Sequence, residues 1–120
     1  VITGSIPASF GGMTTLTWLG LADNSMDGNL PSGLTSLSNL EYLYLSNNSF
    51  DGSLLDFSSI SSLRRIFVDG NSLTGPVPSN YSSMSALQQF KINNNNLDRD
   101  VNYDAEMSGS LLSRFSGLNV

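Results

Sequence analysis

The sequence predicts an α/β-type solenoid, in which about five coils of 24 residues stack along one axis and share a parallel β-sheet on the concave side. The first observation is a period: leucines begin successive units at Leu16, Leu40, Leu63, Leu87 and Leu111. The second is the pattern Leu-x-x-Leu-x-Leu-x-x-Asn, which follows the first four of these leucines with Ile, Val or Phe at some positions. We expect one segment over 1–120, uncapped at both ends, with units at 16–39, 40–62, 63–86 and 87–110, a partial unit at 1–15 and a partial or degenerate unit at 111–120.

Each unit is expected to contain one short strand. The alternation Leu19-x-Leu21 and its equivalents has the period of two that is typical of a strand, with apolar side chains inside and the residues between them facing solvent. A strand this short is not stable alone. The strands of successive units therefore pair, and their leucine layers form one continuous core.

An asparagine follows each strand where the chain turns away. Backbone groups at such a corner need partners inside the coil, and an amide without partners would cost about 1 to 3 kcal/mol to bury. The sequence therefore predicts an inward, hydrogen-bonded ladder of Asn24, Asn48, Asn71 and Asn95.

The outer half of each unit also repeats. Glycines that permit a tight turn or a positive φ occur at Gly4, Gly28, Gly52 and Gly75. Prolines that stiffen the following segment occur at Pro7, Pro31 and Pro78. The third unit is one residue shorter and has Leu55 at the proline position, which predicts a tightened outer loop at Phe57.

Composition excludes several classes of activity. The chain has 5 Lys+Arg against 10 Asp+Glu, a net charge of -5, and neither Cys nor His. This balance does not suit a nucleic-acid partner, and the missing residues exclude disulfides, ordinary zinc sites and imidazole catalysis. We expect no enzyme, cofactor or metal, and no membrane insertion. The first residues lack a secretory signal, so any such signal is expected outside this sequence.

The repeated elements resemble the plant-type leucine-rich repeat family over roughly residues 1 to 100. They are represented by Leu40-x-x-Leu43-x-Leu45-x-x-Asn48 and by Leu73-Thr74-Gly75-Pro76-Val77-Pro78. The resemblance implies a solenoid with an irregular or 3₁₀ convex side. It also implies kinship with ectodomains of receptor kinases and receptor-like proteins and with inhibitors similar to those of polygalacturonases. Such relatives imply an extracellular or cell-surface location and a protein, peptide or glycan ligand.

Parallel stacking aligns solvent-facing strand residues into columns, and these columns are aromatic. One reads Trp18, Tyr42, Arg65, Gln89, and the next reads Gly20, Tyr44, Phe67, Lys91. Trp, Tyr and Arg bury large areas in protein and glycan contacts, so the columns indicate a concave binding face. The predicted partner-binding residues are Trp18, Glu41, Tyr42, Tyr44, Arg65, Phe67, Asp69 and Lys91. The alternative is that these rings pack only on one another and on Arg65.

Other polar groups are interpreted more simply. Glu41 and Arg64 are expected to form an exposed ion pair of little functional weight. Asn47 and Asn80 begin N-x-Ser triplets and are candidate glycosylation acceptors. The acidic cluster Asp98, Asp100, Asp104 and Glu106 does not match a calcium loop and is interpreted as the end of the regular repeats.

The leading hypothesis is therefore a non-catalytic recognition module of an extracellular or cell-surface protein, which binds through its concave face. The alternative is a structural repeat segment of an adhesive, cell-wall, filament or multi-subunit assembly protein, covered at its open ends by neighbouring repeats or subunits. Ice binding, which some relatives show, does not suit columns that mix Trp, Gly, Arg and Lys.

Overall fold

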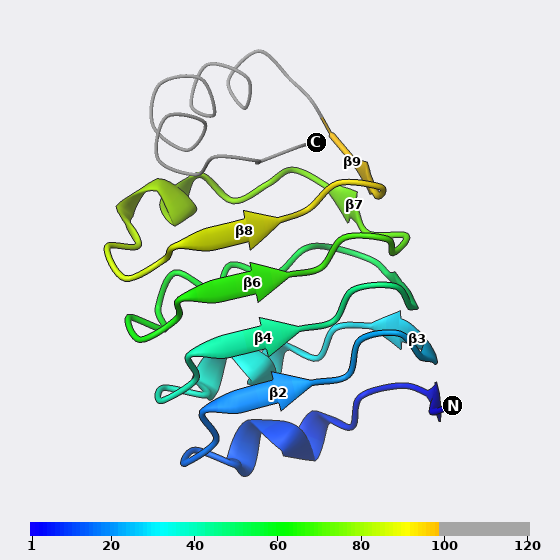
Figure 1. Ribbon diagram of the computed structural model, residues 1–120, viewed down its shortest axis with the longest axis horizontal. Helices are drawn as coiled ribbons and strands as arrows, with labels where there is room; N and C mark the ends of the chain where they lie inside the picture. Colours follow the sequence, from blue (N-terminus) through cyan, green and yellow to red (C-terminus); the bar gives the residue numbers. More distant parts are fainter. Residues whose placement is uncertain (99–120) are drawn as a thin grey trace.

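The computed structural model describes residues 1–98, and these residues form a solenoid of stacked coils (Figure 1). Each coil passes through a strand, a corner, an outer segment and a return loop before the next coil begins against it. The degenerate unit expected at 111–120, and Asp100, Asp104 and Glu106, lie outside the described residues.

Within residues 1–98 the main sheet has four parallel strands in the order β2-β4-β6-β8 (Figure 1). They are β2 (Trp18–Gly20), β4 (Tyr42–Tyr44), β6 (Arg65–Phe67) and β8 (Gln89–Lys91). The middle residue of each strand is buried, as alternation with period two predicts. Leu19 pairs with Leu43, Leu43 with Ile66, and Ile66 with Phe90. The register predicted from the repeat is confirmed.

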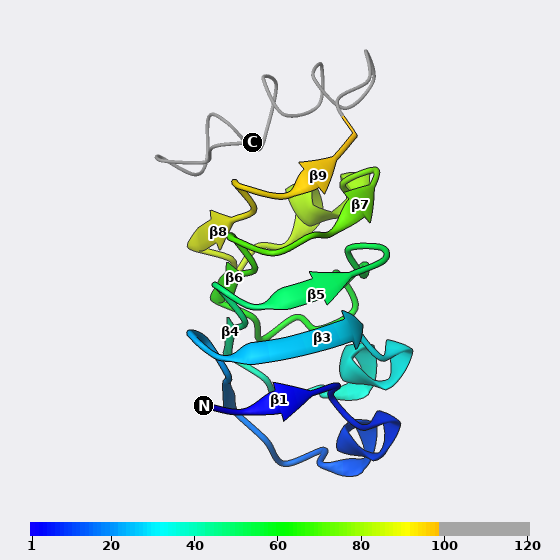
Figure 2. The same cartoon turned by 90° about the vertical axis from the view of Figure 1, so that its right-hand side faces the viewer.

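A second row of short parallel strands follows the corners (Figure 2). It comprises β1 (Thr3–Gly4), β3 (Ser25–Asn29), β5 (Ser49–Asp51), β7 (Thr74–Gly75) and β9 (Asn96–Leu97). Strands β1, β3 and β5 form one sheet and β7 pairs with β9, while an isolated bridge joins Ser53 to Thr74. This row was not predicted from the sequence, because segments such as Ser25–Asn29 have a single buried apolar side chain, Met26, and no alternation.

The outer segments of three coils contain 3₁₀ helices, η1 (Ala8–Gly12), η2 (Ser32–Ser36) and η3 (Ser79–Ser83). A proline precedes each helix, because its fixed φ suits the extended residue that leads into a helical turn. The shorter third coil has turns at residues 58–59 and 61–62 instead of a helix. The missing residue thus removes one helical turn.

Each coil has left-handed backbone at two places, one in or directly after the strand of the second row and one at the corner. Gly4, Gly28, Gly52 and Gly75 have φ values of 84°, 79°, 72° and 81°. This confirms the predicted positive φ, which glycine adopts without strain. A second left-handed position, just before each ladder asparagine, was not predicted; it is occupied by Asp23, Asn47, Gly70 and Asn94. Asp, Asn and Gly are the residues that tolerate this conformation best.

Each ladder asparagine joins two successive coils. The Asn71 amide group donates to the Leu45 carbonyl of the preceding coil at 2.9 Å and to the Val68 carbonyl of its own coil at 3.1 Å, while its oxygen accepts from the Phe50 N–H at 3.0 Å. Asn48 makes the equivalent bonds to Leu21, Leu45 and Met26, and Asn95 makes them to Val68, Ile92 and Leu73. Asn24 donates to the Leu21 carbonyl of its own coil and accepts from the Ile2 N–H. These side chains therefore point into the coil.

The core is one continuous column of aliphatic and aromatic side chains. Leu34, Leu37, Leu40 and Leu43 are fully buried in the second and third coils. Met13 of the first coil is 39% exposed, because no coil of the described chain covers its outer side.

Candidate ligand-binding face

The solvent side of the main sheet presents one aromatic and cationic surface. The register places Trp18 beside Tyr42 and Tyr42 beside Arg65. In the second column Tyr44 lies beside Phe67 and Phe67 beside Lys91. We call this surface the aromatic face, and it consists of Trp18, Tyr42, Tyr44, Arg65, Phe67 and Lys91.

The rings of the aromatic face contact one another around Tyr44. Trp18 meets Tyr44 edge to face with ring centroids 6.0 Å apart, Tyr42 stacks on Tyr44 at 6.2 Å, and Tyr44 contacts Phe67 at 5.1 Å. Such pairs favour a fixed arrangement of rings. The alternative that the rings pack on one another is therefore correct in part, since these rings do contact one another.

The same rings nevertheless leave a depression open to solvent. Trp18, Tyr42, Tyr44 and Arg65 line a depression of about 230 Å³. Trp18 remains 62% exposed although it is the largest side chain on the face. Its indole leans over Gly20, since a Cβ at that position would lie 3.1 Å from the indole Nε1. The missing side chain at Gly20 thus gives the indole its place beside Tyr44.

Two cations lie on this face, held by rings. The Arg65 guanidinium carbon lies 5.6 Å from the centroid of Tyr42, and its Nη1 donates to the Tyr44 hydroxyl at 3.2 Å. That hydrogen bond raises the pKa of Arg65, so the group stays charged. The Arg65 Nε is buried and has no hydrogen-bond acceptor among residues 1–98. The Lys91 ammonium lies 4.6 Å from the centroid of Phe67.

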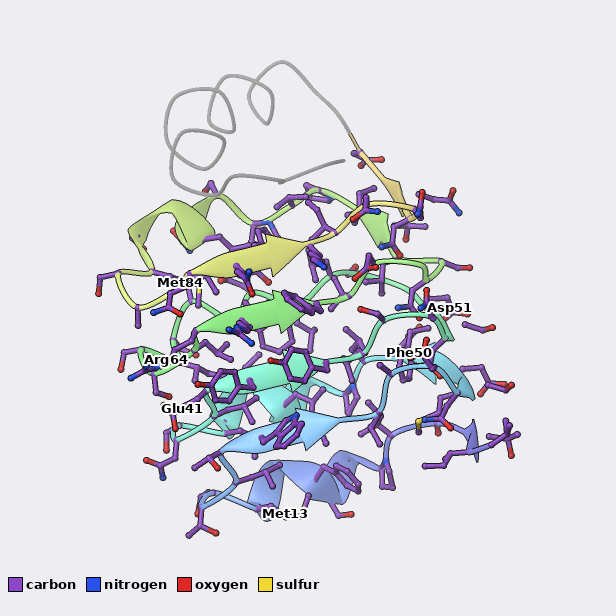
Figure 3. The ribbon with its side chains drawn as sticks, in the orientation of Figure 1. Met13, Glu41, Phe50, Asp51, Arg64 and Met84 are labelled. Atoms are coloured by element: carbon purple, nitrogen blue, oxygen red, sulfur yellow. The ribbon has the colours of Figure 1, made fainter. Side chains whose placement is uncertain are left out.

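The two predicted acidic members have other partners. Glu41 Oε1 forms an ion pair with Arg64 Nε at 3.2 Å, and Figure 3 shows the two side chains together where the strands begin. This confirms the predicted pair. Asp69 accepts a hydrogen bond of 2.6 Å from the Ser46 hydroxyl. Neither acid lines the depression.

The two candidate glycosylation acceptors are exposed, and their amides already have partners. Asn47 Nδ2 donates to Asp23 at 2.7 Å, and Asn80 Nδ2 donates to Asp56 at 3.0 Å. Partial burial acts to raise the pKa of Asp56, but hydrogen bonds from Ser58 and Asn80 outweigh it and lower the pKa overall. Both asparagines lie away from the aromatic face, one at a corner and one in η3.

Within residues 1–98 no helix has the length and apolar character that a membrane crossing requires. The same residues contain no group of three His, Cys, Asp or Glu side chains suited to hold a metal ion.

Comparisons with known proteins agree with this architecture. The family model described as Leucine Rich Repeat matches residues 39–60. Comparison with curated proteins gives no significant match. Among solved structures, the BIR2 ectodomain from Arabidopsis thaliana is similar, with a TM-score of 0.76 and 32% identity over 81% of this chain and 52% of that chain.

Two further solved structures show different activities on the same fold. The Arabidopsis receptor kinase HAESA, in complex with the peptide hormone IDA and the co-receptor SERK1, has a TM-score of 0.71 and 26% identity over 79% of this chain and 20% of that chain. A plant ice-binding protein has a TM-score of 0.76 and 27% identity over 79% of this chain and 31% of that chain. The present chain spans only part of its solved relatives, 12% of one ectodomain and 53% of another.

Proposed function

Because the chain is a leucine-rich-repeat solenoid of the plant type, we propose that it is a non-catalytic recognition module of an extracellular protein, and that it binds a protein or peptide through the aromatic face. The depression bounded by Trp18, Tyr42, Tyr44 and Arg65 is the observation that supports this most directly. Aromatic and arginine side chains around a concave site are typical of the centres of protein interfaces.

The exposed tryptophan strengthens the proposal. A side chain that is 62% exposed contributes little to folding, whereas covering its apolar surface with a ligand would contribute about 25 cal/mol per Å². The neighbouring rings hold Trp18 in one position, so little conformational entropy is lost when a ligand covers it.

The chemistry of the face supports binding without catalysis. The acids near it, Glu41 and Asp69, are engaged with Arg64 and Ser46. A hydrolytic pair would need two free carboxyl groups on either side of a substrate. The structure of HAESA with a peptide hormone and a co-receptor is a precedent for peptide and protein binding by a similar solenoid.

The double variant Trp18→Ala/Tyr44→Ala tests the proposal. A displayed library of random dodecapeptides would be selected on the wild-type chain, and the affinities of the selected peptides would be compared between wild type and variant. We expect at least a tenfold loss, because the walls of the depression are removed. The control is Thr35→Ala on η2, which should leave affinity unchanged. Retained affinity in the double variant would contradict the aromatic face as the site and would favour the alternative, a structural segment that uses its other surfaces.

A further inference from the structure

The cations of the aromatic face have no acidic partner within residues 1–98. Arg64 is the basic side chain with an ion pair, and its partner is Glu41. Arg65 instead contacts Tyr42 and Tyr44, and Lys91 contacts Phe67. Both charges are thus held in place by rings, which attract a cation but do not neutralise it.

This arrangement is unusual for so acidic a chain. The whole sequence has 10 Asp+Glu against 5 Lys+Arg, and the basic residues among 1–98 are Arg64, Arg65 and Lys91. All three lie on or beside β6 and β8 of the main sheet. With so many carboxylates in the chain, folding alone could have paired these cations. Arg65 and Lys91 nevertheless have no acidic partner among residues 1–98, which indicates that a ligand supplies the negative charge.

Arg65 is suited to bind such a charge. A guanidinium has five N–H donors, and the described structure occupies one of them, in the bond to the Tyr44 hydroxyl. The buried Nε lacks an acceptor, which is a cost that a bound carboxylate could remove after a small movement of the side chain. Carboxylates form bidentate pairs with arginine, and Lys91 on the next strand adds a second positive charge.

The position of the cations relative to the depression limits the ligand further. The Arg65 guanidinium reaches back over Tyr42 of β4 and lines the depression itself, and the Lys91 ammonium reaches back over Phe67 of β6. The two charges therefore lie at the depression and about one strand beyond it. In an extended peptide the side chains of residues i and i+2 point to the same side and are about 6.7 Å apart, so one such pair can reach both the depression and the cations.

We propose that the aromatic face binds an acidic, extended peptide segment, with an aromatic or large apolar side chain in the depression beside Trp18 and a carboxylate two residues away on Arg65 and Lys91. The proposal rests on the proposed function, since it names the ligand class of the same site. It adds a chemical requirement, a negative charge, which peptide binding alone does not imply.

The peptides selected on the wild-type chain provide the probe. Trp18 is the single tryptophan of the chain, so its emission reports directly on occupation of the depression. We expect the selected peptides to contain Asp or Glu two residues from an aromatic or large apolar residue. Exchange of that acid for its amide should weaken binding to the wild-type chain at least tenfold, and raising the salt concentration should weaken the acidic peptide more than the amide.

Protein variants separate charge from packing. Arg65→Met and Lys91→Gln retain most of the aliphatic side chain and should each weaken the acidic peptide at least fivefold while changing the amide peptide less than twofold. The matched control is Glu41→Gln/Arg64→Gln, which removes the neighbouring ion pair without changing net charge and should leave affinity within twofold.

The outcomes distinguish the two proposals. Peptides that lose affinity in Trp18→Ala/Tyr44→Ala, but tolerate the acid-to-amide exchange, would overturn the acidic ligand and leave the recognition function standing. A library that yields no peptide sensitive to the double variant would count against both. Because the peptide exchange uses the wild-type chain, an unstable Arg65→Met variant does not affect the decision.

Discussion

At the scale of single residues, the ladder asparagine supplies hydrogen-bond partners that the backbone at the corner cannot supply for itself. At the corner the chain leaves the main sheet, and carbonyl and N–H groups of two coils face the interior. Asn71 contacts the Leu45 and Val68 carbonyls and the Phe50 N–H. Its burial is therefore favourable only because its polar atoms are hydrogen-bonded.

The substitution Asn71→Leu removes these bonds while keeping a similar volume. We expect the free energy of unfolding to fall by about 3 kcal/mol, because buried backbone groups lose their partners. Urea denaturation followed by circular dichroism measures the change. Asn39→Ala is the control: Asn39 is exposed and bonds only the Thr14 carbonyl, so its loss should cost less than about 1 kcal/mol. An unchanged midpoint for Asn71→Leu would contradict the role of the ladder.

The ladder could be predicted from the sequence because Asn occurs at one phase of every unit. The left-handed residue just before it was missed, although Asp23, Asn47, Gly70 and Asn94 share the preference for positive φ. The four differ in side chain, so a comparison by identity does not detect them. A comparison by backbone preference would have done so.

At the scale of elements, the third coil shows how one deletion is accommodated. In the coils that contain a 3₁₀ helix, the N–H of the third helical residue donates to the carbonyl of the proline three residues earlier. Leu34, for example, donates to the Pro31 carbonyl at 3.0 Å. In the third coil Phe57 instead donates to the hydroxyl of Tyr81 at 3.5 Å, and that hydroxyl donates to the Leu55 carbonyl. A side chain from the fourth coil thus replaces a missing helical turn of the third.

The substitution Tyr81→Phe tests whether the third coil depends on this hydroxyl of the fourth coil. Burial raises the pKa of Tyr81, so the hydroxyl remains a donor at all ordinary pH values. Its removal leaves the Leu55 carbonyl without that partner and should lower the free energy of unfolding by about 2 kcal/mol, while the ring keeps its contact with Phe90. Thermal unfolding of Tyr81→Phe and of the control Tyr42→Phe measures the difference. Equal stability of the two variants would show that the hydroxyl does not support the coil.

The sequence predicted that this outer loop differs but not how it is completed. The shorter unit and Leu55 in place of proline indicated a tightened loop, and the described structure has turns there. The contribution of Tyr81 comes from the next coil, 24 residues after Phe57, and depends on where its hydroxyl reaches in space. The second row of strands was missed for a related reason, since its pairing follows from stacking and not from a local apolar pattern.

At the scale of the whole molecule, stacking converts sequence period into surface. The columns of solvent-facing residues on the main sheet could be predicted from the repeat, because parallel register places equivalent residues of successive coils side by side. The arrangement within the aromatic face could not, because ring orientation and the place of Trp18 over Gly20 depend on packing between neighbours. The absence of an acidic partner for Arg65 and Lys91 among residues 1–98 likewise could not be predicted from the repeat, because it depends on distances between side chains.

The same one-dimensional packing makes stability depend on position along the axis. Leu43 is fully buried between Leu19 and Ile66, whereas among residues 1–98 Leu19 has a neighbouring strand on one side only and is 6% exposed. Leu43→Ala should therefore create a closed cavity and cost about 4 kcal/mol, and Leu19→Ala, whose surroundings can relax, about 2 kcal/mol. Urea denaturation of both variants, followed by Trp18 fluorescence and by circular dichroism, measures the two costs. We expect the free energy of unfolding to fall clearly more for Leu43→Ala than for Leu19→Ala. Equal decreases would mean that the coils do not stabilise one another as nearest neighbours.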